Sequence, residues 1–177
     1  MKRLAYGLAL AAMMAVGGGQ PVMAAETRIV ALGASNTYGM GVAPGQAYPA
    51  HLEQMLRSKG IRARVTNKGI NGNTTGQMLL RLGGAVPDGT AIVLLQPGSN
   101  DARLGIDERR RNANIDAIRA HLQARNIKLI MVPESQIAQI RHSSPALDQG
   151  DGTHLTSSGY RALAASLLPQ VIGAIGQ

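Results

Sequence analysis

The chain has 177 residues, a formal net charge of +8 and 45% hydrophobic residues, which fits one domain with its own core and excludes a disordered chain. Cysteine is absent, which excludes disulfides, thiolate nucleophiles and zinc–thiolate sites. Phe and Trp are also absent and the basic residues are scattered, so we expect no nucleic-acid partner and only weak association with anionic envelope surfaces.

The N-terminus has the layout of a secretory signal peptide. Lys2 and Arg3 form a basic start, an apolar run over residues 4–16 follows, and glycines and small residues come next. The run is too short to span a bilayer comfortably, since about 20 residues are needed. We expect a signal peptide over residues 1–24, a domain over residues 25–177 and a periplasmic or secreted location, with an uncleaved anchor as the alternative.

The rest of the chain alternates strands with helices. Strands are predicted over residues 28–32, 61–66, 91–95 and 127–132, and helices over residues 49–59, 74–82, 107–125 and 157–175. The second strand alternates apolar with charged residues, which indicates an edge strand, whereas the others are apolar. The pattern predicts a three-layer α/β/α, flavodoxin-like fold with a parallel sheet in the order 2-1-3-4, whose ligands bind at the carboxyl ends of the strands.

Four loops on that side of the sheet carry polar side chains suited to acyl transfer. They are residues 33–39 with Ser35, residues 67–74 with Gly72, residues 96–101 with Asn100, and residues 151–154 with Asp151 and His154. A hydroxyl nucleophile needs a base, and a neutral histidine oriented by a carboxylate serves near pH 7. The developing oxyanion needs fixed N–H donors, which a glycine backbone and a side-chain amide supply, with Gly69 as an alternative to Gly72.

The four loops resemble, in order, the sequence blocks of the SGNH hydrolases, also called the GDSL esterase/lipase family, over about residues 29–160. The resemblance implies Ser35 as the nucleophile, Asp151 and His154 as the rest of a triad, and an oxyanion hole formed by Ser35, Gly72 and Asn100. It implies a serine hydrolase without cofactor or metal, acting on a small ester or thioester substrate. The oligomeric state is left open, with a monomer favoured. Small periplasmic thioesterase/lysophospholipase and arylesterase members are the most similar types.

Two features depart from the family pattern. The first block usually reads Gly-Asp-Ser, but Ala34 stands in place of the aspartate, so the hydrogen bonding of this turn must differ. The connection between Val132 and His154 is short, so we expect a fifth strand to be short or absent and the acyl pocket to be open, which favours short acyl chains. A carbohydrate O-acetyl esterase of the cell envelope and an inactive binding protein of the same fold are the alternatives.

Overall fold

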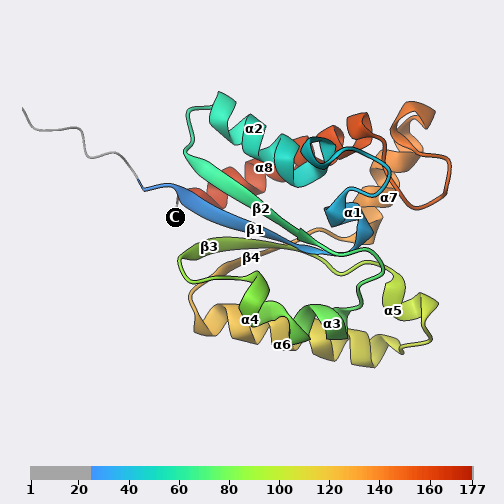
Figure 1. The fold of residues 1–177 in the computed structure, drawn as a ribbon, viewed down its shortest axis with the longest axis horizontal. Coiled ribbons are helices and arrows are strands. Elements are labelled where there is room, and N and C mark those ends of the chain that lie inside the picture. The colour runs from blue at the N-terminus through green and yellow to red at the C-terminus, as the bar shows by residue number, and fades with distance from the viewer. Residues whose placement is uncertain (1–24, 177) are drawn as a thin grey trace, which may run out of the picture.

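Four parallel strands form the central sheet of the computed structural model, which describes residues 25–176 (Figure 1). They are β1 (Thr27–Gly33), β2 (Ala63–Gly69), β3 (Thr90–Gln96) and β4 (Lys128–Met131), in the order β2-β1-β3-β4. The predicted order is therefore confirmed, with β2 at an edge. Apart from an isolated bridge between Asp148 and Leu155, the described residues form no fifth strand.

Helices cover both faces of the sheet (Figure 1). One face carries α2 (Tyr48–Ser58), α7 (Glu134–Ser143) and α8 (Ser157–Ile175), and the other carries α3 (Thr75–Leu80), α4 (Leu82–Ala85) and α6 (Glu108–Ala124). Short helices lie at the carboxyl ends of the strands or in loops: α1 (Ser35–Tyr38), α5 (Asn100–Arg103), η1 (Pro44–Gln46) and η2 (Pro145–Leu147). The three-layer fold is the predicted one.

Alternating residues of β1 belong to two separate hydrophobic clusters, one on each face of the sheet. Ile29 lies in the cluster under α2 and α8, and Val30 lies in the cluster over α3 and α6. Successive strand residues point to opposite faces, so an apolar run of this kind places a strand in the middle of a covered sheet. Each fully buried aliphatic side chain of this size stabilises the fold by about 1.5–3 kcal/mol.

Two fully buried tyrosines join the core to α1. The hydroxyl of Tyr48 lies 3.4 Å from Thr37 Oγ1, and the hydroxyl of Tyr160 donates to Asn36 Oδ1 over 3.2 Å. Burial is the largest influence on both phenols and raises the pKa of each. These contacts tie a short helix, which could not be stable alone, to the centre of the domain.

Besides the short helices, which were not predicted, the structure differs from the sequence-based expectation at three larger elements. β2 extends to Gly69, where it comes so close to α1 that a Cβ would lie 2.1 Å from the Tyr38 nitrogen. The helix predicted over residues 74–82 is two helices, α3 and α4, which meet at Arg81. The segment after β4 contains a helix, α7, that we did not predict.

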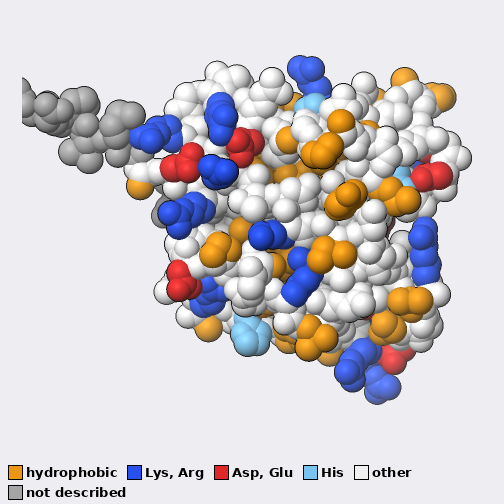
Figure 2. All heavy atoms as spheres, in the orientation of Figure 1, with side chains coloured by type: hydrophobic (Ala, Val, Ile, Leu, Met, Phe, Trp, Pro, Cys, Tyr) orange, Lys and Arg blue, Asp and Glu red, His pale blue; other side chains and the backbone are white. Residues whose placement is uncertain are grey.

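No helix within residues 25–176 is long and apolar enough to cross a bilayer. On the face that Figure 2 shows, the Lys and Arg side chains are spread among hydrophobic ones and do not gather into one patch. The predicted signal peptide lies outside the described residues.

Candidate active site

The turn between β1 and α1 presents Ser35 at the edge of the sheet. Ser35 is the first residue of α1 and is half-buried. The turn is tight, because a Cβ at Gly33 would lie 2.2 Å from Thr37 Oγ1. α1 ends after one turn at Gly39, which adopts a φ of 87° that favours glycine. The sequence Gly-Ala-Ser therefore folds so that the serine hydroxyl stands at the carboxyl end of the central strand.

Ser35, His154 and Asp151 form one continuous hydrogen-bonded chain. Ser35 Oγ lies 2.8 Å from His154 Nε2, and His154 Nδ1 lies 2.5 Å from Asp151 Oδ2. A carboxylate can only accept hydrogen bonds, so Nδ1 carries the ring proton and Nε2 is left to accept the serine proton. His154 is 6% exposed, which keeps the base largely out of water. The structure thus brings together three of the five residues that the sequence singles out.

The carboxylate of Asp151 is held ionised by its own turn. Burial would raise its pKa, but hydrogen bonds from the His154 ring and from the backbone N–H groups of His154 and Thr153 outweigh that effect and lower the pKa to about 2. One oxygen, Oδ1, accepts both backbone N–H groups, at 2.9 Å from Thr153 and 2.8 Å from His154. The other oxygen is therefore aimed at the imidazole.

Asn36 fixes the distance between the nucleophile and the histidine loop. It is 2% exposed, its Nδ2 donates to the Thr153 carbonyl over 3.2 Å, and its Oδ1 accepts from Tyr160. Sequence reasoning missed this residue. An amide directly after the nucleophile was the available signal, but only the folded chain shows that it is buried and bridges two loops.

Three N–H donors are candidates for an oxyanion hole. Asn100 Nδ2 donates one hydrogen to the Asn73 carbonyl over 3.0 Å, which leaves its second hydrogen for a ligand. Within residues 25–176, the backbone N–H groups of Ser35 and Gly72 have no hydrogen-bond acceptor. Gly72 has a φ of 74° and directly precedes Asn73, whose carbonyl accepts from Asn100. In the part of the chain that the structure describes, no hydrogen bond joins Gly72 to Ser35 directly.

Two neighbouring residues of these loops have structural contacts instead. The N–H of Gly69 donates to Asn67 Oδ1 over 2.9 Å, so it is not available to an oxyanion. Asp101 is fully buried and accepts from both the backbone N–H and the hydroxyl of Thr75, at 3.0 and 2.6 Å. Asp101 therefore fixes the start of α3 and does not face Ser35.

The hollow beside Ser35 is small. It has a volume of about 10 Å³ and its walls come from α1, β3, α5, α7 and the histidine loop: Ala34, Ser35, Asn36, Gln96, Gly98, Ser99, Asn100, Arg103, Glu134 and Thr153. That volume holds about one water-sized group. The short connection after β4 holds α7, whose Glu134 contributes to this wall, and the openness of the acyl pocket stays a prediction.

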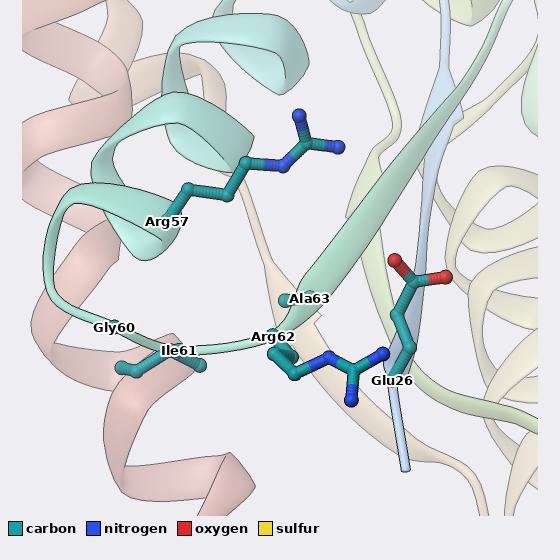
Figure 3. A pocket seen from close by; sticks show the side chains of 6 residues that line it. All are labelled: Glu26, Arg57, Gly60, Ile61, Arg62 and Ala63. Atoms are coloured by element: carbon teal, nitrogen blue, oxygen red, sulfur yellow. The ribbon is translucent and has the colours of Figure 1, made fainter. Parts of the chain in front are cut away.

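Larger hollows are lined by residues other than Ser35, His154 and Asp151. One of about 310 Å³ is at the amino ends of β1 and β2, and Figure 3 shows the side chains of Glu26, Arg57 and Arg62 around it. Another, of about 270 Å³, is lined by residues of the α1–η1 loop and of β2, among them Tyr38 and Val42. Within residues 25–176, no group of three or more His, Cys, Asp or Glu side chains is placed to hold a metal ion.

The model of the GDSL-like lipase/acylhydrolase family matches residues 31–146. The chain belongs to this family. The matched range includes Ser35, Gly72 and Asn100 and ends before Asp151 and His154. For this GDSL-like protein, the last two residues of the candidate triad therefore rest on the geometry described above. A comparison with curated protein sequences gave no match.

Several solved structures share the fold. TesA has a TM-score of 0.73 at 20% identity, over 84% of this chain and 99% of its own. The psychrotrophic esterase EstA from Pseudoalteromonas sp. has a TM-score of 0.72 at 17% identity, over 86% of this chain and 100% of its own. AlinE4, an SGNH-hydrolase family esterase, has a TM-score of 0.66 at 26% identity, over 86% of this chain and 98% of its own.

Proposed function

We propose that this GDSL-like hydrolase is an exported serine esterase that cleaves short-chain carboxylic esters or thioesters through an acyl-enzyme on Ser35. The observation that carries the proposal is the unbroken chain from Ser35 through His154 to Asp151. Esterase activity in AlinE4, which is 26% identical, supports the same chemistry. An inactive binding protein, the alternative from another class, would not need an imidazole that a carboxylate holds 2.8 Å from a serine hydroxyl.

In the proposed reaction, His154 carries out each proton transfer. Ser35 Oγ attacks the acyl carbon while His154 Nε2 takes its proton, and Asp151 stabilises the resulting imidazolium. The carbonyl oxygen becomes an oxyanion facing the N–H groups of Ser35, Gly72 and Asn100. The bond to the leaving group then breaks and His154 returns the proton to it. Water, deprotonated by His154, attacks the acyl-enzyme and releases the acid and Ser35.

Asn100→Ala is expected to lower kcat for p-nitrophenyl acetate by roughly 10²–10³, the usual effect of removing one oxyanion donor. KM should change little, because the donor acts on charge that develops only in the transition state. Steady-state kinetics of the purified variant provide the measurement. A rise in KM at unchanged kcat would instead make Asn100 a ground-state binding residue. Asn112→Ala, which changes an exposed asparagine of α6, is the matched control and should keep wild-type kinetics.

The size of the hollow beside Ser35 favours acyl groups from acetyl to about hexanoyl. A volume of about 10 Å³ cannot enclose a long chain. Each further methylene would gain about 0.8 kcal/mol only if it were buried. We therefore expect kcat/KM for p-nitrophenyl esters to be highest among the short chains and to fall for longer ones, in a series from acetate to palmitate.

An optimum at decanoyl or longer would contradict this expectation and would direct attention to the apolar hollow beside Tyr38 and Val42. Val42→Gln distinguishes the two cases. If long chains occupy that hollow, the variant loses activity on decanoate and keeps activity on acetate. If the small hollow alone sets the range, the variant and the wild type have the same profile.

A carbohydrate O-acetyl esterase remains the second candidate, because the small hollow fits an acetyl group better than any longer one. Acetate release from an O-acetylated polysaccharide, compared with hydrolysis of p-nitrophenyl acetate and acetyl-CoA by the same preparation, separates oxygen-ester, thioester and polysaccharide substrates. Mass spectrometry of the protein recovered from the periplasm tests export, since cleavage after Ala24 or Ala25 defines the mature N-terminus.

A further inference from the structure

The side-chain amide of Gln96 lies at the centre of the turn that precedes Ser35. Gln96 is the last residue of β3 and is 1% exposed. Its Oε1 accepts from the backbone N–H of Ala34 over 3.0 Å and from Thr37 Oγ1 over 3.2 Å. Its Nε2 donates to Glu134 Oε1 over 2.6 Å. One buried amide therefore joins β1, α1 and the first turn of α7.

The partners of Gln96 define which way its amide points. The N–H of Ala34 can only donate, and a carboxylate at Glu134 can only accept. Glutamine matches this pair of neighbours, with its oxygen toward the nucleophile turn and its nitrogen toward α7. Glu134 lies in the first turn of α7, where the helix dipole favours a negative charge.

This contact lies directly beside the candidate nucleophile. Ala34 is the residue immediately before Ser35, and its methyl side chain makes no hydrogen bond to cap α1. The family's first block usually has an aspartate at this position, as noted above. Here the turn is held from outside, by the Gln96 amide on the Ala34 N–H.

We infer that Gln96, oriented by Glu134, is a positioning residue that keeps the Ser35 hydroxyl at hydrogen-bond distance from His154. The inference rests on the esterase function proposed above. It assigns a part in the reaction to α7, the helix that the sequence analysis did not anticipate. Small displacements of a nucleophile are costly, since a misplacement of about 1 Å can lower a rate by about 10².

Exchanging the two side chains tests the inference. Gln96→Glu keeps an oxygen for Ala34 but places two carboxylates at the 2.6 Å contact, so kcat for p-nitrophenyl acetate at pH 8 is expected to fall by about 10- to 100-fold with KM within about twofold. The double variant Gln96→Glu/Glu134→Gln restores one donor and one acceptor with their roles exchanged. Its kcat is expected within about threefold of the wild type.

The pH dependence of kcat in the Gln96 variants provides a second test of the inference. Two carboxylates in contact share a proton as the pH falls, which recreates a donor and an acceptor. The ratio of kcat in Gln96→Glu to kcat in the wild type should therefore rise between pH 8 and pH 5.5. The ratio for the double variant should stay constant. Gln123→Glu, which adds the same charge at an exposed position of α6, is the control and should match the wild type throughout.

A further variant covers the case in which Gln96→Glu does not fold. Glu134→Ala removes the acceptor from a half-buried position, frees the amide to rotate, and is expected to lower kcat about tenfold at unchanged KM. Equal kcat in the wild type, Gln96→Glu and Glu134→Ala, or a double variant no faster than Gln96→Glu, would overturn the inference. A wild type that neither hydrolyses short esters nor reacts with a fluorophosphonate at Ser35 would overturn the proposed function itself.

Discussion

Ser35→Ala is expected to remove nearly all hydrolysis of short p-nitrophenyl esters, with a loss of roughly 10⁴-fold or more in kcat, because no hydroxyl is then left to form the acyl-enzyme. Thermal stability should stay within about 1 kcal/mol, since Ser35 is half-buried and its hydroxyl hydrogen-bonds to the His154 ring near the surface. Rates measured beside melting curves separate the two effects.

A fluorophosphonate probe gives the same test without turnover. Wild-type protein should carry one adduct, which peptide mapping assigns to Ser35, and Ser35→Ala should carry none. Ser58→Ala, at the exposed end of α2, is the control and should label like the wild type. Activity above a few per cent in Ser35→Ala would mean that another group is the nucleophile.

Asp151→Asn is expected to lower kcat by about 10³–10⁴, by analogy with the loss of the buried carboxylate in serine proteases. The amide oxygen can still accept the backbone N–H groups of Thr153 and His154, so the turn is preserved. The amide nitrogen would then face His154 Nδ1 and favour the wrong tautomer, with the proton on Nε2, where it cannot accept from Ser35. Asp148→Asn, three residues earlier in the same loop, is the control and should stay within about threefold of the wild type.

The depressed pKa of Asp151 adds a dependence on pH with a definite sign. Because the pKa is lowered to about 2, the carboxylate stays charged throughout the range in which the enzyme can be assayed. Its contribution to folding stability is present above the ordinary carboxyl pKa of about 3.9 and is lost as the pH falls through about 2. The difference in melting temperature between the wild type and Asp151→Asn should therefore be largest near neutral pH and shrink on acidification. A difference that grew below pH 4 would contradict this.

The elements that could be predicted from the sequence are those with a strong local signal. Apolar runs and one alternating strand determined the sheet order, because central strands are buried on both faces and edge strands on one. The candidate triad was predicted because the block with Ser35 directly follows β1 and the block with Asp151 and His154 precedes the last helix, in the order of the family's sequence blocks. The match of the family model to residues 31–146 confirms the family and includes Ser35, and the hydrogen bonds of the folded chain join Ser35 to His154 and Asp151.

The features that could not be predicted from the sequence depend on contacts between residues far apart in the chain. The register in which Gly33 pairs with Gly69 extends β2, and nothing local in the Asn-Lys-Gly sequence indicates a strand. α7 has weak amphipathic character and is stabilised where Ile137 packs into the core beside α8. Gln96 reads as the polar end of an apolar strand, and its partners Ala34 and Glu134 are 62 and 38 residues away. Such long-range pairs have no periodicity that a sequence pattern could show.

The near-ultraviolet signals of the two buried tyrosines can report on the conformation of α1. With no tryptophan in the chain, its near-ultraviolet absorption and emission come from four tyrosines, of which Tyr6 lies outside the described residues and Tyr38 is 52% exposed. Tyr48 and Tyr160 each contact a side chain of α1, next to Ser35. Near-ultraviolet circular dichroism should therefore change when Ser35 is acylated or α1 shifts. Because burial raises the pKa of both Tyr48 and Tyr160, these two phenols should stay protonated while the domain remains folded.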